Sequence, residues 1–118
     1  MTKIVESKDC GNSPKNKLVQ DAAIGLAIGE LDEAMVADNV IWHDVDDDSF
    51  EGMAAFKERL NKRTPPSAVI VEHAISHGKV GAVSGITKDA NGGETRFCHI
   101  LEFTNSKGNV IAKIRSYA

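Results

Sequence analysis

The chain has 118 residues, and its 42% hydrophobic content is enough to build one sizeable core. We therefore expect a single domain over residues 1–118, in which residues 1–12 form an N-terminal segment. The charged fraction of 26% and the formal net charge of -3 lack the basic excess that phosphate backbones attract, so nucleic acid is not an expected partner. The sequence shows no signal-peptide or membrane-spanning run, which predicts a cytoplasmic protein with no membrane partner.

The first helix is predicted from its boundary residues. The Ser13 hydroxyl can accept from an unpaired backbone N–H, and Pro14 fits the first helical position because it has no N–H to satisfy. Apolar side chains then recur at helical spacing, and Gly29 offers a left-handed stop. The helix should run from about Pro14 to Ile28.

Two shorter helices are expected after it. Glu30 to Ala37 carries apolar residues one turn apart and leads into the strand Val40-Ile41-Trp42. A third helix begins after Gly52, with apolar residues at positions i, i+3 and i+7, and ends before Pro65 and Pro66.

The period changes from helical to strand-like after residue 67. Four strands are predicted there, separated by turns that combine Gly with Asn, Asp or Lys: Ala68 to Ser76, Val80 to Lys88, Glu94 to Thr104 and Val110 to Tyr117. Short turns join neighbours into an antiparallel meander. Helices followed by a meander predict an α+β fold in which the helices cover one face of the sheet.

Metal sites and disulfides are not expected. Cys10 and Cys98 are the only cysteines, and in a reducing compartment they should be free thiols. His73 and His77 are four residues apart, which on a strand separates them by roughly 13 Å, too far to share one ion.

An acidic run imitates the start of a calcium loop at Asp44, Asp46 and Asp48. The sixth position of that loop is Ser49 where the motif needs Gly, and the twelfth is Ala55 where it needs Glu. We interpret the run as a solvated acidic loop.

The order of these parts resembles the nuclear-transport-factor-2-like (NTF2-like) and SnoaL-like superfamily across nearly the whole chain. More narrowly, two stretches look like a small bacterial branch with few characterised members: Asp9-Cys10-Gly11-Asn12-Ser13-Pro14-Lys15 and Phe97-Cys98-His99-Ile100-Leu101-Glu102-Phe103. The resemblance implies a cystatin-like, cone-shaped α+β barrel with three N-terminal helices on a curved antiparallel sheet. It also implies a pocket inside the cone and a homodimer through the outer sheet face.

The enzymes of this superfamily include ketosteroid isomerase, polyketide cyclases, limonene-epoxide hydrolase and scytalone dehydratase. The general-base Asp of ketosteroid isomerase matches Asp44 here, and the protonated Asp of its oxyanion hole matches His99. The oxyanion-hole Tyr falls near Ala22, so the strongest donor of that site is missing. The resemblance thus implies two candidate catalytic residues and an incomplete isomerase set.

The residues themselves leave two interpretations open for each candidate. Asp44 could be a carboxylate enclosed beside Trp42, stripped of water and usable as a base, or a solvated acid at a loop mouth. His99 shares a strand face with Phe97 and Leu101, so it should point inward, either toward a ligand or as a hydrogen-bonded core histidine. Trp42 could form a flat pocket wall or belong to the core.

We expect a pocket protein that binds a small, largely apolar molecule without a cofactor. The predicted lining residues are Trp42, Phe97, Leu101 and Phe103. The alternative is a cofactor-free isomerase, cyclase or dehydratase in which Asp44 moves a proton and His99 stabilises an oxyanion. A second alternative is a protein-interaction module that uses the outer sheet face.

Overall fold

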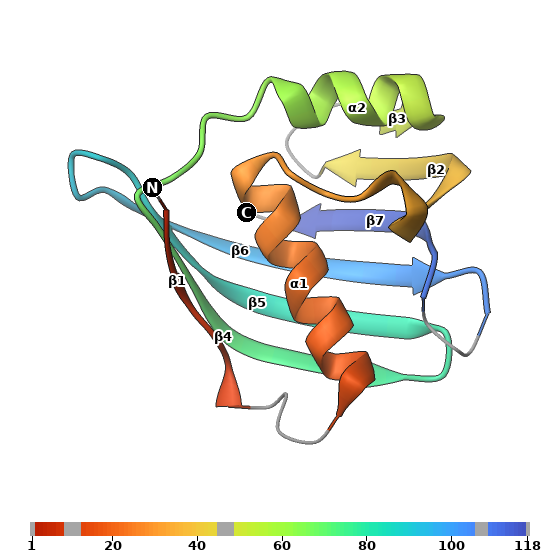
Figure 1. The fold of residues 1–118 in the computed structure, drawn as a ribbon, viewed down its shortest axis with the longest axis horizontal. Coiled ribbons are helices and arrows are strands. Elements are labelled where there is room, and N and C mark those ends of the chain that lie inside the picture. Colours follow the sequence, from red (N-terminus) through yellow and green to blue (C-terminus); the bar gives the residue numbers. More distant parts are fainter. Residues whose placement is uncertain (1, 9–12, 45–48, 106–108, 118) are drawn as a thin grey trace.

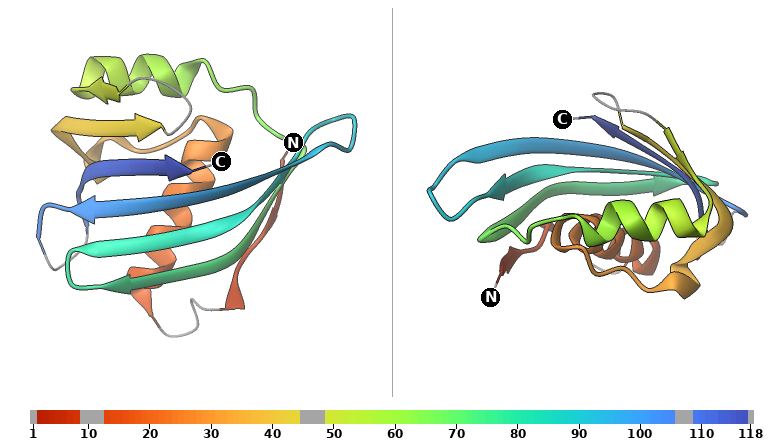
Figure 2. Two further views of the ribbon diagram at one scale, coloured as in Figure 1. Left: turned by 180° about the vertical axis from the view of Figure 1, so that it is seen from behind. Right: turned by 90° about the horizontal axis from the view of Figure 1, so that it is seen from above.

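One curved, seven-stranded sheet carries both α-helices on the same face (Figures 1 and 2). The computed structural model describes residues 2–8, 13–44, 49–105 and 109–117. Predictions about Cys10, Asp46 and Asp48 concern positions outside these ranges. The elements in chain order are β1 (Lys3–Val5), α1 (Pro14–Ile28), the 3-10 helix η2 (Glu33–Met35), β2 (Val36–Asp44), β3 (Ser49–Glu51), α2 (Met53–Asn61), β4 (Ala68–His77), β5 (Val80–Lys88), β6 (Glu94–Phe103) and β7 (Ile111–Tyr117). The strand order across the sheet is β1-β4-β5-β6-β7-β2-β3.

Helix α1 begins and ends where its sequence signals predict. The Ser13 side chain accepts from the backbone N–H of Asn16, Pro14 occupies the first turn, and Gly29 closes the helix in the left-handed conformation at φ 78°. Its small and branched apolar side chains are buried against β4 and β5. None of the helices in the described ranges is long and apolar enough to cross a membrane.

The prediction of a helix over Glu30 to Ala37 is wrong, so the described part of the chain contains two α-helices where three helices were expected. Only one 3-10 turn forms there, begun by the Asp32 side chain, which accepts from the backbone N–H of Ala34. Val36 already pairs with Ile111 of β7 and is 4% exposed. Burial of Val36 at a strand position therefore ends the helical turn after η2.

The sheet is mixed, which corrects the expectation of an antiparallel one. Strands β4 to β7 form the predicted antiparallel meander, but β1 runs parallel to β4, and β2 runs parallel to β7. Short turns identify only antiparallel neighbours, because a parallel pair joins segments that lie far apart in the sequence. Strands β1 and β3 have three residues each, too few to show an alternating pattern.

Strand register places one apolar row across the middle of the sheet. Trp42 of β2 pairs with Ile114 of β7, which pairs with Leu101 of β6, and all three side chains are fully buried. The Trp42 ring packs on Phe56 of α2 with ring centroids 5.5 Å apart. This row forms the floor of the core, and the helices cover it.

Gly85 of β5 lets an aromatic side chain lie directly on the strand. It pairs with Phe97 of β6, and a Cβ at Gly85 would lie 2.7 Å from the Phe97 ring and also collide with the carbonyl oxygen of Ile70. Because a backbone oxygen cannot rotate away, any side chain at Gly85 must push β4 and β5 apart.

We expect Gly85→Ala to lower the free energy of unfolding by about 1–3 kcal/mol, since an added methyl group overpacks this contact. Urea denaturation measures the change. Ser84→Thr is the matched control, because it adds one methyl group on the opposite face of the same strand. Equal stabilities for Gly85→Ala and the wild type would contradict the close packing of Phe97.

Candidate functional site

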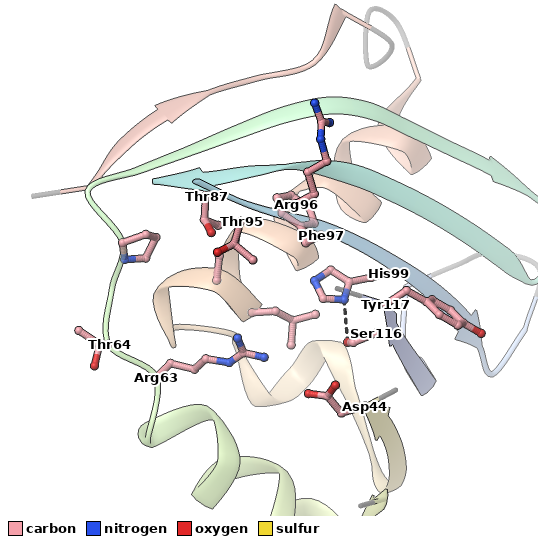
Figure 3. Close-up of a pocket in the computed structure, with 13 residues that line it drawn as sticks. Asp44, Arg63, Thr64, Thr87, Thr95, Arg96, Phe97, His99, Ser116 and Tyr117 are labelled. Carbon is pink, nitrogen blue, oxygen red and sulfur yellow. Dashed lines mark hydrogen bonds between the residues drawn. The ribbon is translucent and has the colours of Figure 1, made fainter. Parts of the chain in front are cut away.

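A pocket of about 180 Å³ lies beside the apolar core row (Figure 3). Its wall is built from the end of α1, the end of β2, the segment that follows α2, and strands β5, β6 and β7. The lining residues are Leu26, Ala27, Asp44, Arg63, Thr64, Pro66, Thr87, Thr95, Arg96, Phe97, His99, Ser116 and Tyr117. Apolar side chains from α1 and β6 thus face polar ones from β2, β7 and residues 63–64.

Three polar side chains form a second row, two residues along each strand from the apolar row. Asp44 of β2 pairs with Ser116 of β7, and Ser116 pairs with His99 of β6. Strand side chains alternate between faces, so these three lie on the same face as Trp42 and its partners. The sheet therefore changes from apolar to polar over one step of the pleat, and the pocket lies at that step.

Ser116 connects the core to the pocket by two hydrogen bonds. Its hydroxyl oxygen accepts from Nε1 of Trp42 at 2.8 Å and lies 2.7 Å from Nδ1 of His99. Indole Nε1 can only donate, so the Ser116 oxygen accepts from it and keeps its own proton and a second lone pair for Nδ1. The neutral His99 ring therefore either accepts at Nδ1 and carries its proton on Nε2, or donates from Nδ1 and leaves Nε2 as an acceptor. The structure gives Nε2 no hydrogen bond to a described residue.

Burial keeps His99 neutral. The residue is 7% exposed, and desolvation, aided by the nearby positive charge of Arg63 and opposed by Asp44, lowers the pKa of His99 from 6.5 to about 4. At neutral pH the imidazole therefore carries no charge. Its ring also stacks on Phe97 with centroids 5.4 Å apart.

Asp44 is held in an ion pair. One of its carboxylate oxygens accepts from Nη2 of Arg59 at 2.7 Å, and the two side chains are 15% and 26% exposed, respectively. The Arg59 guanidinium lies 5.0 Å from the Phe50 ring centroid, which covers it on one side. Proton transfer through this oxygen of Asp44 would have to break the pair with Arg59.

Arg63 brings a second guanidinium to the same pocket. Its Cζ lies 5.2 Å from the Trp42 ring centroid, and its Nε is buried without a hydrogen bond to any described residue. Desolvation, together with the charge of Arg59 and against that of Asp44, lowers the pKa of Arg63. Gly29 lies close to this segment: a Cβ there would be 3.0 Å from the carbonyl oxygen of Leu60 and in ordinary contact, at 3.5 Å, with the Cβ of Arg63.

The sequence-predicted site residues separate into two groups. Asp44, His99 and Phe97 line the pocket, whereas Trp42, Leu101 and Phe103 lie in the buried core and are not among the lining residues. The alternation of side chains along each strand correctly puts these side chains on one face of the sheet. It does not separate the pocket from the core, because that depends on position along each strand.

Sequence reasoning missed Arg63 and Ser116. Arg63 follows a helix with exposed lysines at positions 57 and 62, and only its place just before Thr64-Pro65-Pro66 distinguishes it from them. Ser116 was detectable in principle, since a small polar residue stands on the same face as Ile114 in a strand whose inward side is otherwise apolar.

Comparison with known proteins shows the fold. No family model and no curated protein matches the chain. Among solved structures, an NTF2-like protein of unknown function from Burkholderia xenovorans LB400 superposes with a TM-score of 0.70 and 18% identity, over 87% of this chain and 81% of the other. A putative ketosteroid isomerase from Kribbella flavida gives a TM-score of 0.68 with 17% identity, over 86% and 75% of the two chains. A putative SnoaL-like polyketide cyclase from Jannaschia sp. CCS1 gives 0.61 with 12% identity, over 89% and 88%.

These likenesses confirm the NTF2-like, α+β fold that the order of sequence elements predicts. At such low identity they say nothing about the chemistry of this pocket, because one fold supports many functions.

The depressed pKa of His99 predicts a pH-dependent stability. In the unfolded chain the imidazole takes a proton near pH 6.5, whereas in the folded chain it does so only near pH 4, so the unfolded state binds more protons between these values. The contribution of neutral His99 to the free energy of unfolding is complete above pH 6.5, and about 3 kcal/mol of it is lost as the pH falls to 4.

Urea denaturation from pH 4 to 7 should show a flatter profile of unfolding free energy against pH for His99→Gln than for the wild type. His77→Gln, at an exposed histidine, should keep the wild-type profile, and parallel profiles for all three proteins would contradict the assignment.

Proposed function

We propose that this protein binds a small, largely apolar metabolite in the pocket between α1, β2, β6 and β7. One observation carries the proposal: an apolar surface of Leu26, Ala27 and Phe97 adjoins a neutral His99 whose Nε2 has no partner among the described residues. Such a combination of apolar surface and a few convergent polar groups is typical of ligand sites. His99 supplies orientation, and the apolar wall supplies most of the binding energy.

The pocket volume limits the size of the ligand. A cavity of about 150 Å³ accommodates benzene. The pocket of about 180 Å³ therefore has room for one ring with a small substituent, or for a short branched chain. Larger ligands would need displacement of Thr64 or Thr95 at the rim.

The alternative is acid–base catalysis by Asp44 with His99 as oxyanion donor. Both side chains line the pocket, which favours this alternative, but the ion pair with Arg59 occupies one Asp44 oxygen. We therefore rank binding above catalysis.

The expected homodimer through the outer sheet face also stays a proposal. Ile75 and Val80 support it, because they are 57% and 44% exposed on the face of β4 and β5 that the helices leave uncovered.

Filling the pocket should abolish binding. Ala27→Phe places a ring in the cavity from α1, so saturation-transfer NMR with one-ring ketones, alcohols and acids should show contacts for the wild type and none for this variant. Ala54→Phe, at an exposed position of α2, is the matched control and should bind as the wild type does. Equal signals from all three proteins would place any binding outside the pocket and refute the proposal.

Removing the carboxylate should leave binding intact. We expect Asp44→Asn to lose about 1 kcal/mol of stability with the half-buried ion pair, and to bind the same fragments as the wild type. Deuterium exchange at the α-carbons of cyclohexanone in D₂O, followed by NMR, tests proton abstraction directly. We expect cyclohexanone to exchange with either protein at the same rate as in buffer alone. Faster exchange with the wild type that is lost in Asp44→Asn would instead establish the catalytic alternative.

A further inference from the structure

We infer that the ligand of this pocket carries one negative charge, as a carboxylate on a ring or short chain, and that Arg63 binds that carboxylate. The inference rests on the proposed function and specifies its ligand class. The geometry behind it is a half-buried cation, with its Nε buried and without a hydrogen bond to a described residue, at the edge of a one-ring cavity.

Among the charged lining residues that the structure describes, Arg63 has no ion pair, and Asp44 offsets its charge only in part. These charged residues are Asp44, Arg63 and Arg96. Asp44 is paired with Arg59 at 2.7 Å, and Arg96 reaches Glu72 at 3.2 Å with its side chain 74% exposed. Figure 3 shows Arg96 pointing away from the pocket, while Arg63 extends into it toward His99. The positive charge of Arg63 is therefore the one that a ligand would meet.

The surroundings of Arg63 destabilise its positive charge when no ligand is bound. Its Nε is removed from water without a hydrogen bond to a described residue, and Arg59 adds repulsion from a second guanidinium. A buried cation without its hydrogen bonds destabilises a fold, so such groups are normally paired. The Trp42 face stabilises the charge only in part, since exposed or half-exposed cation–π contacts are worth roughly 1 kcal/mol. An anionic ligand would supply the missing partner.

The donors of Arg63 favour a carboxylate in particular. A guanidinium presents its N–H groups in a planar fork that matches the two oxygens of a carboxylate. On the facing wall, Nε2 of neutral His99 adds no charge and, in the tautomer that carries its proton there, is a second donor. Beside it, the ring of Phe97 and the side chains of Leu26 and Ala27 offer an apolar surface for the remainder of the ligand. The carboxylate would therefore lie at Arg63, and the apolar end would lie against Phe97, Leu26 and Ala27.

Benzoate and benzamide are the appropriate probes. They share one ring and nearly the same shape, which suits the pocket volume of about 180 Å³, but only benzoate is charged. Chemical-shift titrations of the wild-type protein should show benzoate binding at least about tenfold tighter than benzamide, because hydrogen bonds to charged groups are the stronger ones. Shifted amides should include those of Phe97, His99 and Ser116.

Arg63→Gln should remove this preference. We expect its affinity for benzoate to fall by about tenfold or more, to that of benzamide, while its affinity for benzamide is unchanged. Arg96→Gln is the matched control, because it removes a lining arginine that already has a carboxylate partner, and it should keep the wild-type preference.

Two measurements made without ligand distinguish a loss of benzoate binding in Arg63→Gln from a folding defect. Arg63→Gln removes a half-buried charge that has no ion pair with a described residue, so its urea midpoint should equal or exceed that of the wild type. The pKa of His99, followed by NMR, should rise in the variant, because Arg63 helps to lower it.

Different outcomes separate this inference from the proposed function. Benzamide binding as tightly as benzoate, or a preference that survives Arg63→Gln, would overturn the anion inference and leave pocket binding standing. Failure of both probes at millimolar concentration, with no contacts to the pocket amides, would contradict the proposed function and this inference together.

Discussion

The register between β2, β7 and β6 is the constraint on which the pocket depends. It aligns Trp42 with Ile114 and Leu101, and two residues further along it aligns Asp44 with Ser116 and His99. A shift by one residue in any of these strands would turn its polar side chain to the other face and expose its core residue. The burial of the apolar row therefore fixes the geometry of the polar row beside it, and the hydrogen bond from Trp42 to Ser116 joins the two rows.

The segments that cover the sheet bring further charged side chains to the pocket. The left-handed Gly29 ends α1 and lies close to Leu60 of α2 and to Arg63 in the chain that follows α2. Arg63, Arg59 and Asp44 then share a space in which burial strengthens every charge interaction. Among these groups the protein neutralises His99 by depressing its pKa and pairs Asp44 with Arg59. Arg63 has no ion pair with a described residue, and its Nε is buried without a hydrogen bond to one, which calls for an explanation in a folded protein.

Structural neighbours with 12–18% identity share this architecture, which shows how little of the sequence the fold requires. A curved sheet and covering helices need only apolar side chains of suitable size at the core positions. The side chains at the polar row and in the segment after α2 are free to differ without loss of the fold. Function must therefore be argued from Asp44, Arg63 and His99 as they stand in this chain.

The sequence by itself determined the elements whose signals are local. The Ser13 cap, Pro14 and Gly29 delimit α1, and turns around Gly78 and Gly92 define the meander, because capping and turn chemistry act within a few residues. Alternation also placed His99 on the inner face. Only the tertiary structure decided that β2 runs parallel to β7, that Trp42 belongs to the core, and that Arg63 enters the pocket. These three features join segments far apart in the chain, and such contacts are selected by the packing energy of the whole core, which no local pattern encodes.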